Sequence, residues 1–413
     1  MRIALCHNYY QLRGGEDQVF EDERSLLRAH GHDVFDYTVH NDSVADHSKL
    51  TLARQTVWNR RAANEIAQLV RRERIDVVHF HNTFPLISPA AYYGAHRAGA
   101  AVVQTLHNYR LHCPAATRFR CGTHCDDCIG KLFAWPAVKH KCYRGSRSAT
   151  AVLVTMLSLH RLRGTWNREV DRYIALTAGG RQRFVDAGWP AERIEVKPNF
   201  IQCDPGAGPG GGSYAIFVGR LSEEKGIRTV LDAWSRCSEL PRLKLVGEGP
   251  LEHLVQAAAE RDKRIEPVGF RPLDEIYPML GAATCLVMPS VWHEPFGRTV
   301  IEAFAKGTPV LASRVGALAE LVTDGLTGNL FPAADADALA ETLMQMQANP
   351  SNLQRMRIAA REEYEAHYTP AANYAQLHDI YQRALTQATL RNTHPSDVAT
   401  STNQSSCDAQ PTG

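Results

Sequence analysis

The feature that most constrains the fold of this chain is a regular alternation of short strand-like runs with longer amphipathic stretches. The first half has strand-like runs at 2–5, 34–38 and 77–81, with amphipathic stretches at 19–30 and 59–72 between them. A strand that is repeatedly followed by a helix is typical of a parallel sheet. The sequence therefore predicts an α/β fold.

Several of the strand-like runs are apolar without interruption. Ala101-Val102-Val103 and Ile216-Phe217-Val218 are examples, and similar runs continue to about residue 349. Continuous apolar strands are needed where helices cover both faces of a parallel sheet. We therefore expect doubly wound units in both halves of the chain.

The length and a glycine-rich segment predict how the chain is divided. At 413 residues it should hold about two or three domains. Residues 202–213 are rich in Gly and Pro and lack periodicity, which is typical of a linker. The predicted units are a first domain at 1–200, a linker at 201–212, a second domain at 213–370, a helix at 371–390 that packs back on the first domain, and a disordered tail at 391–413.

Composition excludes several classes of protein. With 44% hydrophobic residues and a net charge of +2, the chain is neither typically disordered nor typical of nucleic-acid binders. The apolar run at the N-terminus is too short for a signal peptide, and the longest apolar window, 149–159, is too short to span a bilayer. We expect a cytoplasmic protein.

Two cations flank the turn that follows the strand-like run ending at Gly219. Arg220 offers a fork that matches phosphate oxygens, and Lys225 offers a point charge. Together they can hold and neutralise a diphosphate. The alternative is that both form ordinary surface salt bridges with Glu223 and Glu224.

A second turn carries two carboxylates with seven residues between them. Glu294 precedes a predicted helix start marked by Pro295 and Gly297, and Glu302 falls in the second turn of that helix. Both can face one cleft, where one would hold sugar hydroxyls and the other a ribose. Each alone could also be an ordinary helical glutamate. A third turn, with Gly247 and Glu248, permits close backbone approach but is weak evidence by itself.

These motifs resemble the retaining glycosyltransferases of family four, the glycosyl transferases group 1. The resemblance rests on Glu-x7-Glu at Glu294 and Glu302, on Gly219-Arg220 and Lys225, and on 307–312 and 324–328. It implies the GT-B fold, in which two Rossmann-like domains face each other across a donor cleft. One departure lies at 315–320, where the family's usual second Gly and the Pro before the Glu are absent.

The resemblance also implies roles for single residues. Arg220 and Lys225 would hold the diphosphate of a nucleotide sugar, Glu294 would contact the transferred sugar, and Glu302 the ribose. Catalysis would retain the anomeric configuration and require no metal or other cofactor. The further expected donor contacts are Gly219, Gly247, Glu248, Phe296 and Gly297.

The first half contributes two expected parts of the site. Gly14 and Gly15 follow the first strand, where the family's glycine-rich loop approaches the donor, although a simple turn is the alternative. His107 ends another strand, where the resemblance places a histidine near the reacting sugar. A lone histidine is more often structural, and His79, His81 and His112 could equally be packing residues.

A cysteine cluster follows His107 in an insertion at 113–142. The thiolates of Cys113, Cys125, Cys128 and Cys142 could coordinate a zinc ion tetrahedrally. Cys121 would then not be a ligand. The alternative is a loop with free thiols. In either case we expect the insertion to line the acceptor side.

The segment 131–172 carries nine Lys or Arg against two acidic residues, with aromatic residues interspersed. Such a segment suits an anionic lipid surface on the inner face of the membrane, or a lipid-diphosphate acceptor. A solvated basic face with packed aromatics is an equal alternative.

The sequence thus favours transfer of a sugar from a nucleotide-diphosphate sugar to a glycan or lipid-linked acceptor, in polysaccharide or glycoconjugate synthesis. Two alternatives stay open. One is an epimerase or hydrolase acting on the nucleotide sugar alone, and the other is a catalytically silent binding module.

Overall fold

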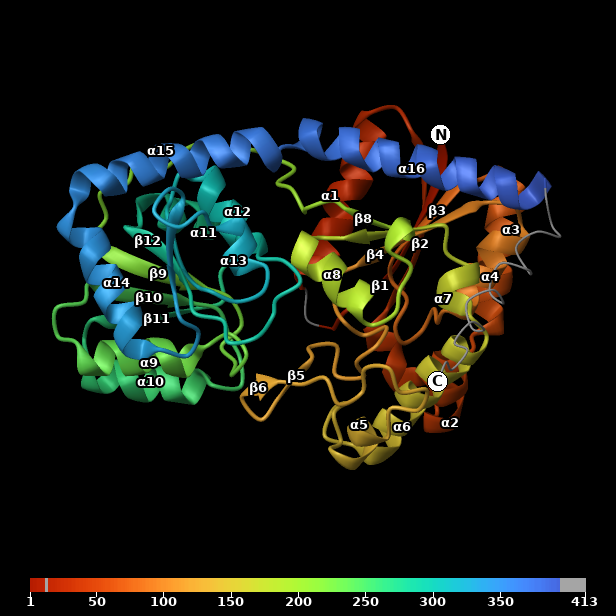
Figure 1. The fold of residues 1–413 in the computed structure, drawn as a ribbon, viewed down its shortest axis with the longest axis horizontal. Helices are drawn as coiled ribbons and strands as arrows, with labels where there is room; N and C mark the ends of the chain where they lie inside the picture. The colour runs from red at the N-terminus through yellow and green to blue at the C-terminus, as the bar shows by residue number, and fades with distance from the viewer. Residues whose placement is uncertain (12–13, 394–413) are drawn as a thin grey trace, which may run out of the picture.

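The computed structural model describes residues 1–11 and 14–393 and contains two α/β domains, each built on a six-stranded parallel sheet (Figure 1). The α/β prediction is confirmed. Across the first sheet the strands are β2 (Asp33–His40), β1 (Arg2–Tyr9), β3 (Val77–Asn82), β4 (Ala101–Leu106), β7 (Arg172–Ala175) and β8 (Ile194–Val196). Each neighbouring pair is parallel.

The second sheet has the strand order that is typical of dinucleotide-binding domains, in which the third strand lies at one edge and the sixth at the other. Its strands, in order across the sheet, are β11 (Ile265–Gly269), β10 (Arg242–Val246), β9 (Tyr214–Val218), β12 (Cys285–Met288), β13 (Val310–Ser313) and β14 (Gly328–Phe331). The strand order reverses between β9 and β12, and in the first sheet between β1 and β3.

Helices cover both faces of each sheet, as continuous apolar strands require. Those of the first domain are α1 (Gly15–Ala29), α2 (Lys49–Val57), α3 (Arg60–Glu73), α4 (Ala90–Arg97), α5 (Trp135–Lys139), α6 (Arg147–Leu162), α7 (Thr165–Arg168), α8 (Ala178–Asp186) and the short 3₁₀ helices η1 (Asn41–Asp46) and η2 (Ala191–Arg193). Those of the second are α9 (Ile227–Arg236), α10 (Glu252–Arg261), α11 (Leu273–Ala282), α12 (Arg298–Ala305), α13 (Leu318–Leu321) and α14 (Ala336–Ala348).

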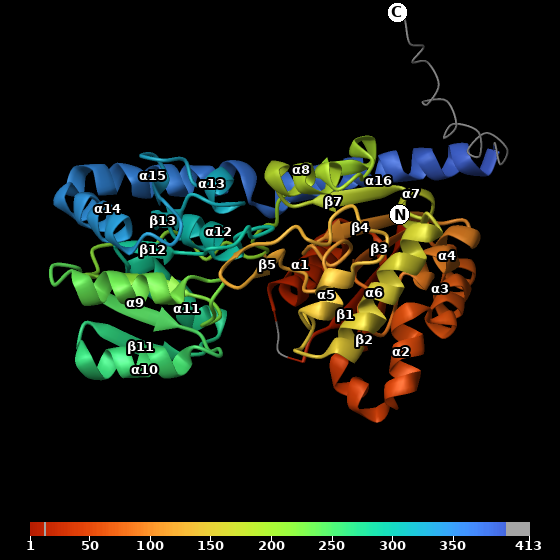
Figure 2. The ribbon, with the colours of Figure 1, turned by 60° about the horizontal axis from the view of Figure 1, so that its bottom comes forward.

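The last two helices join the domains along one side of the molecule. α15 (Pro350–His367) lies over the second domain, and α16 (Pro370–Thr393) returns over the first (Figures 1 and 2). Leu377 and Tyr381 of α16 are fully buried in one apolar cluster with Ile3 and Leu5 of β1. α16 therefore completes the core of the first domain and extends beyond the expected end at 390, while 394–413 of the predicted tail lie outside the described residues.

The glycine-rich linker is attached to the second domain. Gly208 N–H donates to the carbonyl of Lys306, and Gly212 N–H donates to that of Ala282. A Cβ atom at Gly212 would lie 2.1 Å from the Ala282 oxygen, so a larger residue would push the linker away. Glycine here allows close backbone approach.

One helix begins earlier than the sequence pattern predicts. The amphipathic stretch was expected at 19–30, whereas α1 starts at Gly15. The Asp17 carboxylate accepts a hydrogen bond of 2.8 Å from Gly14 N–H and caps the helix start, so a polar first turn precedes the apolar pattern. Within the described residues, none of the helices is both long and apolar enough to cross a bilayer.

Candidate active site

The domains meet around the loops that follow their strands. Thr177, just after β7, donates to the Pro295 carbonyl at 3.3 Å. The Glu320 carboxylate accepts from the N–H groups of Ala178 and Gly179 at 2.7 and 2.9 Å, across the domain boundary. Ligands of open α/β sheets bind at the carboxyl ends of the strands. The loops between the two sheets are therefore the place for a site.

Lys225 and Glu294 form an ion pair at the carboxyl edge of the second sheet. Lys225 Nζ lies 2.9 Å from Glu294 Oε1, and the Ser290 hydroxyl donates to the same oxygen. The Glu294 side chain is only 5% exposed, and that of Lys225 is 24% exposed. The structure thus brings together two residues that the sequence assigned to one site, 69 positions apart.

Arg220 follows β9 and is exposed. Among the residues that the structure describes it has no hydrogen-bond or ion-pair partner, so the alternative salt bridges of Arg220 to Glu223 or Glu224 do not form. Glu223 instead pairs with Arg228 at 2.9 Å. The Arg220 guanidinium is therefore available to an anionic ligand.

Glycines let the loops around Arg220 approach one another closely. A Cβ atom at Gly247, where φ is +132°, would lie 2.0 Å from the Gly219 carbonyl oxygen. The N–H of Leu221 donates to the Glu248 carbonyl at 2.9 Å. Glu248 thus takes part through its backbone, while its side chain is exposed.

Glu302 lies on α12 and is tied to a cation that reaches the other domain. Arg298 donates to Glu302 at 3.0 Å and pairs with Asp22 of α1 at 2.8 Å. Burial raises the pKa of Glu302, and Arg298 opposes that shift. Gly297 caps α12, whereas the Phe296 side chain is buried in the apolar core, so only the backbone of Phe296 is left for a donor contact.

His107 and the Gly14-Gly15 loop lie together on the first domain. His107 lines a cavity of about 40 Å³ at the ends of β3 and β4. Its neighbour Asn108 donates to Glu16 at 2.7 Å, in the first turn of α1, which begins at Gly15. Burial raises the pKa of Glu16. The two parts of the first half that the sequence singled out are therefore neighbours.

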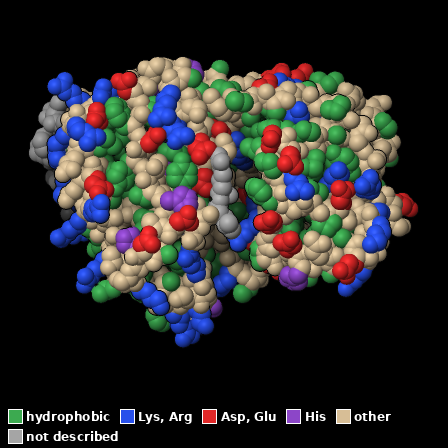
Figure 3. All heavy atoms as spheres, turned by 180° about the vertical axis from the view of Figure 1, so that it is seen from behind, with side chains coloured by type: hydrophobic (Ala, Val, Ile, Leu, Met, Phe, Trp, Pro, Cys, Tyr) green, Lys and Arg blue, Asp and Glu red, His purple; other side chains and the backbone are tan. Residues whose placement is uncertain are grey.

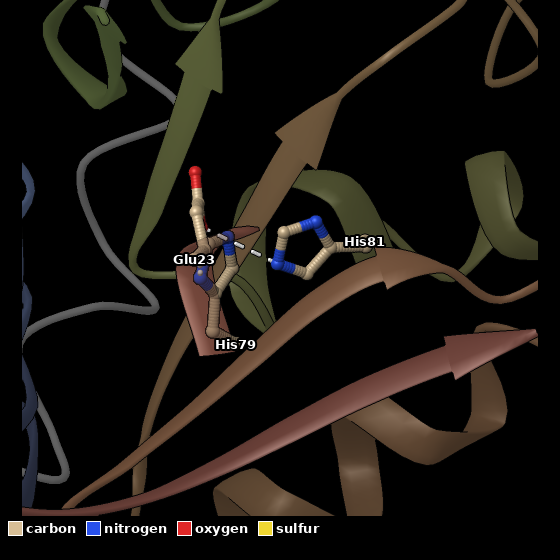
Figure 4. A group of neighbouring side chains, drawn as sticks. All are labelled: Glu23, His79 and His81. Carbon is tan, nitrogen blue, oxygen red and sulfur yellow. Dashed lines mark ion pairs between the residues drawn. The ribbon is translucent and has the colours of Figure 1, made fainter. Parts of the chain in front are cut away.

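A buried charged pair that the sequence pattern did not predict lies next to His81, which lines this cavity. Lys197 Nζ lies 2.7 Å from Glu23 Oε1, and both side chains are 0% exposed. Glu23 also lies beside His79 and His81 (Figure 4). The only sequence signal for Lys197 is its position directly after β8, at the end of a strand.

Glu23, His79 and His81 form the one group of three potential metal-ligand atoms within 4.8 Å of one another in the described part of the chain. The Lys197 ammonium already neutralises the carboxylate of this group. A metal ion would have to displace or adjoin that buried charge, which is unfavourable. This group is therefore better explained as a polar network than as a metal site.

The cysteine-rich insertion lies beside the cleft. Cys113, Cys125, Cys128 and Cys142 line one cavity of about 20 Å³. The hairpin of β5 (Phe119–Arg120) and β6 (Thr123–His124) extends toward the second domain (Figure 1), where the centroid of the His124 ring lies 4.8 Å from that of the His293 ring. Burial lowers the pKa of His293 to about 4. The insertion thus reaches the residue next to Glu294.

Solved structures share the fold over nearly the whole chain. Sucrose-phosphate synthase from Thermosynechococcus elongatus superposes with a TM-score of 0.67 at 20% identity, covering 93% of this chain and 99% of that one. Anabaena HepE in complex with UDP and glucose gives 0.66 at 18% identity, covering 92% and 98%. The architecture is GT-B.

Curated relatives match over part of their length. D-inositol 3-phosphate glycosyltransferase of Corynebacterium diphtheriae is 33% identical over 180 residues, which are 40% of this chain and 41% of that protein. The 2-deoxystreptamine glucosyltransferase of Streptomyces kanamyceticus is 32% identical over 233 residues, 51% of this chain and 58% of that protein. The matches thus span about half of each relative.

Two family models match successive parts of the chain. The model described as Glycosyltransferase Family 4 matches residues 13–205, and the one described as Glycosyl transferases group 1 matches residues 206–363. The second match contains Arg220, Lys225, Glu294 and Glu302. On both matches, the chain belongs to glycosyltransferase family 4, the group 1 glycosyl transferases.

Proposed function

We propose that this protein transfers a glycosyl unit from a nucleotide-diphosphate sugar to a glycan or lipid-linked acceptor. The observation that carries the proposal is the pair of cations at the carboxyl edge of the second sheet, where Arg220 has no partner among the described residues and Lys225 pairs with Glu294. Arg and Lys side chains are well suited to bind the oxygens of a diphosphate. Relatives named as glycosyltransferases and the HepE complex with UDP-glucose support it.

In this proposal each group has a task. Arg220 and Lys225 stabilise the negative charge that develops on the leaving diphosphate, so they supply the charge that a metal ion supplies elsewhere. Glu294, with its carboxylate held by Ser290, contacts the transferred sugar, and Glu302 holds the ribose. The acceptor enters from the first domain, beside His107. Family membership supports retention of the anomeric configuration, with a donor phosphate oxygen acting as base on the acceptor hydroxyl.

A panel of nucleotide sugars tests this proposal. We expect release of nucleoside diphosphate from one donor, dependent on added acceptor and greatly reduced by Glu294→Ala. Release without acceptor would instead indicate the hydrolase or epimerase alternative. Donor binding without turnover on any acceptor would indicate a silent module.

We also propose that Cys113, Cys125, Cys128 and Cys142 bind a structural zinc ion that orders the insertion. Their thiols share one small, mostly enclosed cavity beside an apolar cluster that includes Ala137, and four thiolates form a common tetrahedral zinc site. No three of these sulfurs meet within 4.8 Å in the described residues. Binding would therefore draw the thiols inward.

Metal analysis of the purified protein is expected to find about one zinc per chain. The double variant Cys125→Ser, Cys128→Ser should lose that zinc, since two ligands are gone. Cys121→Ser is the matched control, because Cys121 lies exposed in the same insertion and should leave the metal content unchanged. Metal-free wild-type protein, purified without chelator, would contradict the site.

We also propose that the first domain contacts an anionic membrane as a peripheral partner. Leu132, Phe133 and Trp135 are 47%, 46% and 60% exposed, and Lys139 and Lys141 are exposed beside them. Basic and apolar side chains are mixed at the lower tip of the first domain in Figure 3. Exposed apolar groups flanked by lysines suit the surface of an anionic bilayer.

Vesicle sedimentation measures this contact. The wild-type protein should bind vesicles that contain phosphatidylglycerol and not those of phosphatidylcholine alone. Lys139→Ala with Lys141→Ala should weaken binding about tenfold or more, since each basic residue near the surface contributes about 1 kcal/mol. Arg228→Ala, on the second domain, is the control. Equal binding to both kinds of vesicle would contradict an electrostatic contact.

A further inference from the structure

A series of close polar contacts connects the buried core of the first domain to His107. Lys197 Nζ lies 2.7 Å from Glu23 Oε1, and Glu23 Oε2 lies 3.4 Å from His81 Nε2. His81 Nδ1 in turn lies 3.0 Å from His107 Nε2. In Figure 4 the Glu23 carboxylate lies next to both histidine rings of β3. The contacts thus run from α1 through β3 to the end of β4.

The charge of each residue in this series of contacts follows from its burial and its partners. Burial raises the pKa of Glu23, but Lys197 and His81 outweigh that effect, so the pKa of Glu23 lies well below its usual value. Burial lowers the pKa of both His81 and His107. At neutral pH the carboxylate is therefore ionised and both imidazoles are neutral. A neutral imidazole carries a single N–H.

The position of each proton can then be assigned. Glu23 Oε2 and His81 Nε2 lie 3.4 Å apart, and neither forms a hydrogen bond within the described residues, so a lone pair on His81 Nε2 would face the carboxylate with no donor between them. Because a carboxylate only accepts, His81 must carry its proton on Nε2. His81 Nδ1 is then an acceptor, so His107 must carry its proton on Nε2. The remaining nitrogen, His107 Nδ1, is left with a lone pair.

His107 Nδ1 has no hydrogen-bond partner in the described part of the chain, while the ring lines the cavity at the ends of β3 and β4. Hydroxyl groups are donors that match a bare imidazole nitrogen. His79 Nδ1 also lies 3.5 Å from Glu23 Oε2, but both nitrogens of His79 are already hydrogen-bonded, to Tyr381 at 2.8 Å and to Thr105 at 2.7 Å. The series of contacts therefore ends at one acceptor atom, His107 Nδ1, on the ring that lines the cavity.

We propose that Glu23 and Lys197 are positioning residues that fix the tautomer of His107 through His81, and so present His107 Nδ1 as an acceptor to a substrate hydroxyl. The assignment of the protons on His81 and His107 depends only on contacts within the protein. The identity of the hydroxyl, on a sugar, rests on the proposed function. The two parts can therefore fail separately.

Histidine ¹⁵N NMR of the full-length protein tests the tautomer directly. We expect wild-type His107 to be protonated on Nε2. Glu23→Gln should reverse the order, because Lys197 would hold the new amide oxygen and turn the amide N–H toward His81 Nε2. Protonation of wild-type His107 on Nδ1, or an unchanged tautomer in a folded Glu23→Gln protein, would overturn the proposal.

A second variant keeps the test usable if Glu23→Gln does not fold. Glu23→Leu with Lys197→Met replaces both charges by apolar groups, which buried pairs often tolerate. We expect His107 to populate both tautomers in this variant. A single Nε2-protonated form, as in wild type, would count against control by Glu23. Tyr381→Phe is the matched control, because it removes a buried partner of His79 only, and it should leave the tautomer of His107 unchanged.

Activity supplies the second readout. We expect kcat to fall about 100-fold in Glu23→Gln, the size of effect that positioned proton-handling groups have. The Michaelis constant should rise for the substrate whose hydroxyl hydrogen-bonds to His107 Nδ1. This shows whether that hydroxyl belongs to the nucleotide sugar or to the acceptor. A reversed tautomer without change in kcat or in either Michaelis constant would overturn the role of Nδ1. If the wild type transfers no sugar, the proposed function fails while the NMR result still decides the tautomer.

Discussion

Replacing Lys225 by alanine is expected to lower kcat for sugar transfer by about 10²–10³, which corresponds to roughly 3–4 kcal/mol of transition-state stabilisation. The reason is twofold. The leaving diphosphate loses a cation, and Glu294, now without its partner at 2.9 Å, adds an unbalanced negative charge near the same place. Steady-state kinetics with saturating donor and acceptor measures the effect.

Arg228 provides the control for this experiment. It lies at the start of α9, three residues after Lys225, but its side chain is 56% exposed and pairs with Glu223. Arg228→Ala should therefore leave kcat close to that of the wild type. If Lys225→Ala behaved like Arg228→Ala, the diphosphate would not bind at this turn.

The second large effect concerns stability. Lys197→Met should lower the free energy of unfolding by about 3–5 kcal/mol at pH 7, because it leaves the buried Glu23 carboxylate without its counter-charge. Denaturant titration measures this loss. Lys306→Met is the control, since Lys306 is also largely buried but donates to the Pro205 carbonyl. It should cost only about 1 kcal/mol.

The pH dependence of that loss follows from the direction of the pKa shift. In the wild type the pKa of Glu23 is depressed on folding, so its contribution is present above its unfolded value, about 4.3, and is lost as the pH falls below it. In Lys197→Met the folded pKa should rise, so the carboxyl group can bind a proton. The difference in stability should therefore shrink as the pH is lowered from 7 toward 5. A constant difference would contradict the ion-pair explanation.

Features set by local sequence could be predicted. The strand–helix alternation is set by short local segments. The positions of the carboxylates and cations around Gly219 and Gly297 are set by turns a few residues long. The resemblance assigned Lys225 and Glu294 to one donor site, and both residues follow strands that end at the same edge of a parallel sheet. The GT-B architecture then followed from the resemblance that these residues carry.

Features that depend on distant packing could not be predicted. Glu23 and Lys197 are 174 positions apart, and neither lies in a motif that suggests a partner. Asp22 and Arg298 belong to different domains, so their ion pair depends on how the domains meet. Phe296 was assigned to the donor because it lies inside the motif, yet its ring packs in the core. Pattern places a residue in a loop, whereas packing decides where its side chain points.

The most direct measurement of the central claim is the fate of the sugar itself. Wild-type protein would be incubated with the donor that supports nucleotide release and with its acceptor, and the acceptor would be analysed by mass spectrometry and by NMR of its anomeric proton. The account predicts an acceptor heavier by one glycosyl residue, linked with the anomeric configuration of the donor. Free sugar or an epimerised nucleotide sugar, with the acceptor unchanged, would contradict it.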